Sequence, residues 1–148
     1  MSFVEETYPT TRHLNTLMQH YDELYFGGQV VGQPCNGQLY VALTDRLGRG
    51  VLGQFDPRRP VIVMAWSLVS FRTEEERREL LLHEMTHAWL WRTKQPWGHT
   101  PTFRRKLHQV LREEFAIVIT KSSVRVPQGV RQIRDGQRTL PGLEFPQI

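Results

Sequence analysis

The hydrophobic pattern of the chain changes its period along the sequence, and each period predicts a different kind of element. Between Leu14 and Tyr25 the apolar residues recur every three or four positions, as on one face of a helix. Thr10-Thr11 can cap the start of this helix, and Gly27-Gly28 follows its end, where glycine tolerates the left-handed conformation. The pattern therefore predicts a first helix whose apolar stripe packs in the core.

Three short stretches with strand character follow this helix. Residues 39–43 alternate with period two, residues 51–55 return after a turn, and residues 61–65 are continuously apolar. Glycine, proline and charged residues at 45–50 and 57–60 predict tight turns between them. We expect an α+β fold with a short three-stranded antiparallel sheet and flanking helices, in which one edge of the sheet can hold an extended peptide by strand addition.

A second helix has a well-defined start in the sequence. Thr73-Glu74-Glu75-Glu76 forms a capping box, with threonine at the N-cap, glutamate three residues later and acid in the first turn. Residues 80–90 are apolar on almost every side, which is typical of a helix buried in a small domain. Polar residues inside such a helix are costly to bury unless something satisfies them, and a metal ion would do so.

These polar residues are His83, Glu84 and His87, which form the pattern His-Glu-x-x-His. Residues four apart lie on the same face of a helix, so the two imidazoles can bind one ion. Glu84 follows the first histidine and can reach a water on that ion, as a base rather than a ligand. A single buried histidine is usually a hydrogen-bonded core residue, but the full pattern on a capped helix predicts a zinc hydrolase.

The candidate for a third metal ligand is His99. It stands immediately before a third predicted helix, in which Thr100 is the N-cap and Pro101 occupies the first helical position. Three protein ligands leave a fourth position open for water, which is typical of catalytic zinc. Three other residues compete for this role: His108, Glu113 and Glu114.

The composition is that of a soluble globular protein of one domain. The chain has 148 residues, of which 39% are hydrophobic and 23% charged, and it contains neither a membrane span nor a signal peptide. Cys35 is the sole cysteine, so an internal disulfide and a cysteine-rich zinc ribbon are both excluded. Its neighbours offer no base or cation to activate it as a nucleophile. We expect a cytoplasmic or nucleoid-associated protein that is not secreted and contacts no membrane.

Positive charge is concentrated toward the C-terminus. The net charge is +4, and residues 96–148 contain nine Lys/Arg against four Asp/Glu. Such an excess can bind a phosphate backbone or an acidic substrate, or simply keep the protein soluble. Candidates for contact with single-stranded DNA, in which aromatic residues stack on bases beside a basic groove, are Trp97, Arg104, Arg105 and Lys106. The alternative for Trp97 is packing in the core. Residues 121–148 are predicted to form a basic, loosely structured tail.

With these motifs the chain resembles the SprT-like metalloprotease family, which includes the Spartan proteases that degrade proteins crosslinked to DNA. The matching features are the sequence from Tyr21 to Gly28, the strands, the run from Leu82 to Ala88, and Gly98-His99 followed by Pro101 and Phe103. The resemblance covers roughly residues 10–115. It implies a small zincin-like metalloprotease domain over residues 1–120.

The resemblance also implies the chemistry of the site. His83, His87 and His99 would bind one catalytic Zn²⁺, and Glu84 would be the general base and acid. The substrates would be DNA-bound or DNA-crosslinked proteins. The chain departs from the family at Thr100, where glycine is usual, and it lacks the zinc ribbon or long tail of many relatives. Two alternatives therefore remain: a DNA-independent protease acting on one regulatory protein, and a non-catalytic zinc-containing module that binds DNA.

Overall fold

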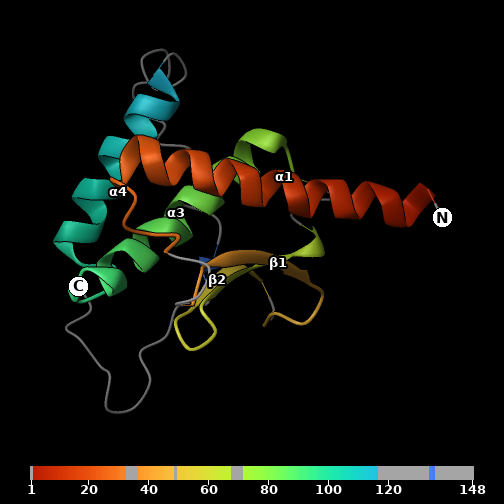
Figure 1. The fold of residues 1–148 in the computed structure, drawn as a ribbon, viewed down its shortest axis with the longest axis horizontal. Helices are drawn as coiled ribbons and strands as arrows, with labels where there is room; N and C mark the ends of the chain where they lie inside the picture. The colour runs from red at the N-terminus through yellow and green to blue at the C-terminus, as the bar shows by residue number, and fades with distance from the viewer. Residues whose placement is uncertain (1, 33–36, 49, 68–71, 117–133, 136–148) are drawn as a thin grey trace.

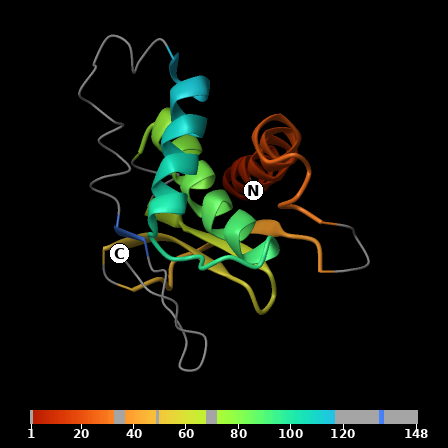
Figure 2. The same cartoon turned by 90° about the vertical axis from the view of Figure 1, so that its left-hand side faces the viewer.

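The computed structural model describes residues 2–32, 37–48, 50–67, 72–116 and 134–135. The elements within these ranges are α1 (Ser2–Tyr25), β1 (Tyr40–Thr44), β2 (Val51–Asp56), β3 (Val61–Ala65), α3 (Glu74–Arg92), α4 (Pro101–Glu114) and β4 (Arg134–Asp135). The helices lie on one side of the sheet, and α1 crosses over α3 (Figures 1 and 2). The predicted α+β class is confirmed. No helix among the described residues is long and apolar enough to cross a membrane.

The sheet is mixed, so the prediction of an antiparallel sheet is wrong for one pair of strands. The strand order is β1-β3-β2-β4. β2 and β3 form the expected antiparallel pair, whereas β1 runs parallel to β3. The reason is that β3 lies between β1 and β2, so the turn after β1 does not close a hairpin. Parallel neighbours need a crossover rather than a tight turn, and β2 with its two turns provides it.

Of the three predicted strands, β1 and β2 each have a further partner on the side away from β3. On β1, the side-chain amide of Asn15 accepts a hydrogen bond from the backbone N–H of Val41 at 2.8 Å and donates one to its carbonyl at 3.2 Å. On β2, the two residues of β4 pair in parallel, with Val51 opposite Arg134. Asn15 thereby covers an edge that would otherwise present unpaired backbone groups. The binding of a peptide by strand addition stays a prediction.

Helix α3 lies in the centre of the protein and packs directly on the sheet. Its capping box is confirmed, because the Thr73 hydroxyl accepts from the Glu76 N–H and the Glu76 carboxylate accepts from the Thr73 N–H, each at 3.1 Å. Most of its residues from Glu79 to Leu90 are buried. At Gly53 of β2 an added Cβ would lie 2.8 Å from the Leu80 side chain. A side chain at this position would therefore require the end of the Leu80 side chain to shift.

Helix α1 begins earlier than predicted. It starts at Ser2, so Thr10 and Thr11 lie inside the helix and do not cap it. The apolar stripe that predicted this helix starts only at Leu14, because the preceding turns extend past the core they would pack on (Figure 1). Its end agrees with the prediction, since Gly27 and Gly28 adopt positive φ angles of 62° and 75°. The predictions for Cys35 and for most of the tail fall outside the described residues.

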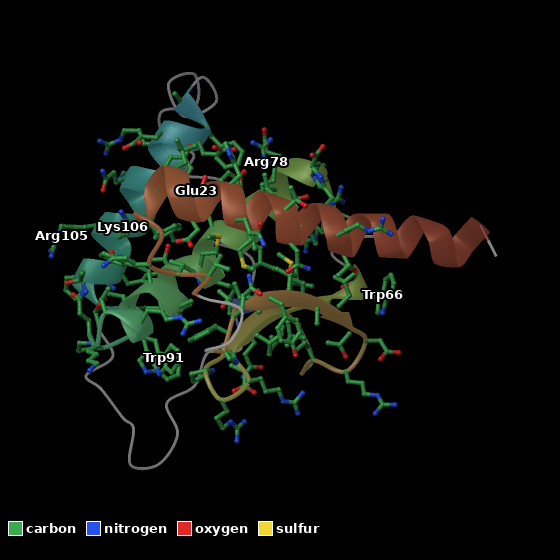
Figure 3. All side chains as sticks on the ribbon, viewed as in Figure 1. Glu23, Trp66, Arg78, Trp91, Arg105 and Lys106 are labelled. Carbon is green, nitrogen blue, oxygen red and sulfur yellow. The ribbon has the colours of Figure 1, made fainter. Side chains whose placement is uncertain are left out.

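One side-chain cluster joins all three helices. The Glu114 carboxylate on α4 accepts hydrogen bonds from the hydroxyls of Tyr21 and Tyr25 on α1, each at 2.6 Å, and pairs with Arg78 on α3. Arg78, which Figure 3 labels at the upper edge of α1, also donates to the Tyr21 hydroxyl at 2.8 Å. Burial alone would raise the pKa of Glu114, but the tyrosine hydrogen bonds and the charge of Arg78 outweigh it and lower the pKa. We call these four residues the helix clamp.

Candidate metal centre

Three histidines from two separate segments meet between α3 and the start of α4. One nitrogen from each of His83, His87 and His99 lies within 4.8 Å of the others. The ring centroids are 5.2 Å apart for His83 and His87, and 4.9 Å apart for His87 and His99. His83 and His87 are buried and His99 is half-buried. Because imidazole nitrogens at such separations can share one ion, the group can hold a metal.

The position of His99 depends on the cap of α4. The Thr100 hydroxyl accepts a hydrogen bond from the backbone N–H of Phe103 at 3.2 Å, which is N-cap geometry. The Arg104 guanidinium, one turn into α4, donates to the carbonyl of His99 at 2.7 Å. These two contacts fix the carbonyl of the histidine and the helix cap that directly follows it. Threonine in place of the family's usual glycine therefore still supports the residue before it.

The orientation of His87 is set by the backbone of the loop between the helices. Its Nδ1 lies 2.6 Å from the carbonyl oxygen of Trp97. A carbonyl can only accept, so Nδ1 carries the proton and donates it, and Nε2 is the nitrogen whose lone pair can bind a metal. Such a contact from the second ring nitrogen is usual for a metal-binding histidine, because it fixes both the tautomer and the ring.

Phe103 on α4 packs against all three imidazoles. Its ring stacks on that of His87 with centroids 4.3 Å apart, and it meets the rings of His83 and His99 edge-on at 5.0 Å. Phe103 is itself buried. All three imidazole rings therefore pack on the same apolar surface, the ring of Phe103. This contact limits their rotation and keeps water from one side of the group.

Glu84 lies next to His83 on α3 and is fully buried, with no exposed surface. A carboxylate removed from water in this way needs compensating charge or hydrogen bonds. A cation held by the adjacent histidines would supply positive charge close to it. The donor set also suits zinc, which takes three imidazoles and leaves a fourth position open in catalytic sites. The buried acid and the three nitrogens thus fit a metal that activates water.

The residues that competed with His99 in the sequence lie elsewhere in the structure. His108 is exposed on α4, where its Nδ1 lies 3.2 Å from the Arg112 guanidinium. Glu113 is exposed and accepts from the Gln109 amide at 3.3 Å. Glu114 belongs to the helix clamp. None of these three residues joins the histidine group in the part of the chain that the structure describes.

The predicted nucleic-acid residues separate into two kinds. The ring of Trp97 is only 4% exposed and packs edge-on against Phe55 at 5.9 Å, so the prediction that it stacks on bases is wrong. The alternative that the sequence allows for Trp97, packing in the core, is confirmed. The Lys106 ammonium donates to the carbonyl of Tyr25 at 2.6 Å, which gives this cation a structural role. Arg104 and Arg105 are exposed, and for both of them DNA contact stays a prediction.

Comparisons with known proteins match the chain to a protein family and to a solved structure. The model of the SprT-like family matches residues 14–123. The chain is also similar to the crystal structure of a metallopeptidase zymogen, abylysin from Pyrococcus abyssi, with 17% identity and a TM-score of 0.48 over 72% of this chain and 91% of that chain. A search of curated proteins gave no match.

Proposed function

The chain belongs to the SprT-like family, whose model matches it over residues 14–123, and on this premise we propose that it is a zinc-dependent endopeptidase. The observation that supports the proposal most directly is the group of His83, His87 and His99 beside the buried Glu84. A purely structural zinc site has no use for an acid at this position. A structural site would also be expected to have four protein ligands and no open position, whereas three histidines come together here among the described residues.

The chemistry of the proposed reaction is divided between the ion and the protein. When bound, zinc lowers the pKa of water to about 7 and polarises a carbonyl group as a Lewis acid. The three histidines would hold the ion, and the Trp97 carbonyl keeps His87 in the tautomer that this would require. Glu84 takes the proton of the attacking water and then delivers it to the leaving amine. Its full burial, directly after His83 in α3, supports this role.

The second part of the proposal concerns the substrate. We propose that the protein cleaves proteins that are bound or crosslinked to DNA, as the resemblance to the Spartan proteases implies. The net charge of +4 supports contact with DNA, since it is concentrated in the C-terminal third of the sequence. A DNA-independent protease with one regulatory target remains the alternative, and stimulation by DNA separates the two.

The test compares cleavage of a DNA-binding protein by the wild type and by Glu84→Gln, each with and without single-stranded DNA. Glu23→Gln is the matched control, because Glu23 is exposed and lies on α1 (Figure 3), which carries none of the three histidines. We expect Glu84→Gln to retain one zinc per chain and to lose activity by about 10²- to 10⁴-fold, the usual contribution of a general acid–base residue. Glu23→Gln should match the wild type.

Three outcomes would count against the proposal. Proteolysis that survives in Glu84→Gln would remove the role of that residue. Zinc-loaded wild type without any peptidase activity would favour a non-catalytic module. Equal cleavage with and without DNA would retain the protease but reject the DNA-coupled substrate.

A further inference from the structure

A groove of about 480 Å³ lies between α3 and α4, with a lining that is separate from the three histidines. It is lined by Trp89 of α3 and by Thr102, Arg105, Lys106, His108, Gln109 and Arg112 of α4. We propose that this groove binds the phosphate backbone of a single-stranded nucleic acid. The inference deepens the DNA-coupled part of the proposed function, although binding itself does not depend on hydrolysis.

The charge of the groove is of one sign. Three basic residues line it, and among the described residues no aspartate or glutamate does so. The nearest acid on α4 is Glu113, which stands outside the lining and accepts a hydrogen bond from Gln109. The lining also contains the hydroxyl of Thr102, which lies beside Arg105, and the amide of Gln109, which lies between Arg105 and Arg112. Such a surface attracts a polyanion and offers additional hydrogen bonds to its phosphate oxygens.

The lining residues of α4 follow one face of the helix. Thr102, Arg105, Gln109 and Arg112 are spaced three, four and three residues apart, which keeps them in one row. Arg105 and Arg112 are exposed and lie about 10 Å apart along the axis, given a rise of 1.5 Å per residue. Arg105 extends outward from the protein (Figure 3). Each guanidinium can therefore contact a different phosphate of one strand.

Lys106 and Trp89 form the fixed wall of the groove. The Lys106 ammonium bonds to the carbonyl of Tyr25 and lies 5.0 Å from the centre of the Trp89 ring. The Trp89 indole also donates to Gln29 at 3.3 Å. Burial lowers the pKa of Lys106, opposed by the charge of Glu113. The wall is thus held from α1, and the two arginines are the exposed cations.

An aromatic ring beside a row of arginines favours nucleic acid over an acidic peptide. Proteins that bind single strands without sequence preference combine a basic groove with aromatic side chains. An acidic peptide would use only the charges. The place of the groove also suits the proposed function, because α4 starts directly after His99 and its row of lining residues begins at Thr102. A strand held there lies beside the helix that positions a metal ligand.

The test measures binding of a fluorescently labelled oligothymidylate by anisotropy over a range of salt concentrations, with zinc-loaded protein. The variants are Arg105→Gln, Arg112→Gln and the double variant. Arg46→Gln is the matched control, since Arg46 is also exposed but lies after β1, outside the groove lining. Each phosphate contact on a single strand contributes about 0.7 to the slope of log K against log salt. We expect each groove variant to reduce the slope by about 0.7 and the double variant by about 1.4, with Arg46→Gln unchanged.

Several results would overturn the groove as the binding site. One is that Arg46→Gln reduces the slope of log K against log salt as much as the groove variants do, which would show that binding depends only on the net charge of the protein. Another is polyglutamate competing as well as unlabelled oligonucleotide, which would assign the groove to acidic peptides. Absence of binding by the wild type would end the proposal. Normal binding by Glu84→Gln together with an inactive wild type would instead retain the groove and reject the proposed protease.

Discussion

Replacing Glu114 with glutamine removes the charge at the centre of the helix clamp. Its side chain is 9% exposed and accepts two short hydrogen bonds from Tyr21 and Tyr25, while its partner Arg78 is 33% exposed. A hydrogen bond to a charged group contributes about 1.5 to 3 kcal/mol, and the partly exposed ion pair adds less because solvent screens it. Glutamine keeps one acceptor oxygen. We therefore expect the free energy of unfolding to fall by about 2 to 4 kcal/mol at neutral pH.

The pH dependence follows from the lowered pKa of Glu114. A carboxyl group whose pKa is lower in the folded state stabilises the fold above its unfolded pKa, which is about 4.3 for glutamate. This contribution is lost as the pH falls through the folded value. The difference in stability between wild type and Glu114→Gln should therefore be constant from neutral pH down to about 5 and shrink below it.

The assay is urea unfolding of metal-free protein, followed by circular dichroism, for the wild type, Glu114→Gln, Tyr25→Phe and the double variant. The thermodynamic cycle isolates the bond between the two residues, and we expect a coupling of about 1 to 2 kcal/mol. A coupling below about 0.5 kcal/mol would refute the reasoning, because the hydroxyl and carboxylate would then contribute independently. A difference that grows at acid pH would refute the assigned sign of the pKa shift.

Two further predictions concern the metal centre and the sheet edge. Loss of a residue that only contacts a metal ligand weakens metal binding roughly 10- to 100-fold, so His99→Ala, which removes a ligand, should weaken zinc binding by more than this. His108→Ala should leave zinc binding unchanged. Titration against a competing chelator measures both affinities, and equal losses in the two variants would contradict the assignment of His99 as a ligand. Asn15→Ala should lower the free energy of unfolding by about 1 to 3 kcal/mol, since both backbone groups of Val41 lose their partner. Urea unfolding of the two proteins measures this loss, and an unchanged midpoint would contradict it.

The parts of the fold that the sequence predicts well are set by neighbouring residues. The capping box at Thr73 and the cap at Thr100 each depend on residues within one turn, and both caps are found as expected. The order of the strands depends instead on which segments meet across the chain. Nothing in residues 45–50 distinguishes a hairpin from a crossover that admits β3 beside β1, so the parallel pair could not be predicted.

The functional residues likewise include some that local sequence patterns predict and others that depend on contacts between distant segments. His83 and His87 follow from helical spacing, and His99 from its place before a cap. The groove was missed because Trp89 and Arg112 are far apart in the sequence and each alone is unremarkable on an amphipathic helix. The clamp was missed for a related reason, since Arg78 and Glu114 are 36 residues apart. A single sequence without aligned relatives offers no pattern for such distant pairs.

The contacts that position the histidines are all made by the protein itself. His87 is oriented by the Trp97 carbonyl, His99 is held by the cap of α4 and by Arg104, and Phe103 packs against the imidazole rings. In domains that fold only with metal, a preformed site is rarely present, and binding energy becomes folding energy. Here the helices carrying the ligands are joined by a buried core and by the helix clamp. Zinc removal should consequently abolish catalysis while leaving the helical content intact, which separates the chemistry of the metal from the stability of the fold.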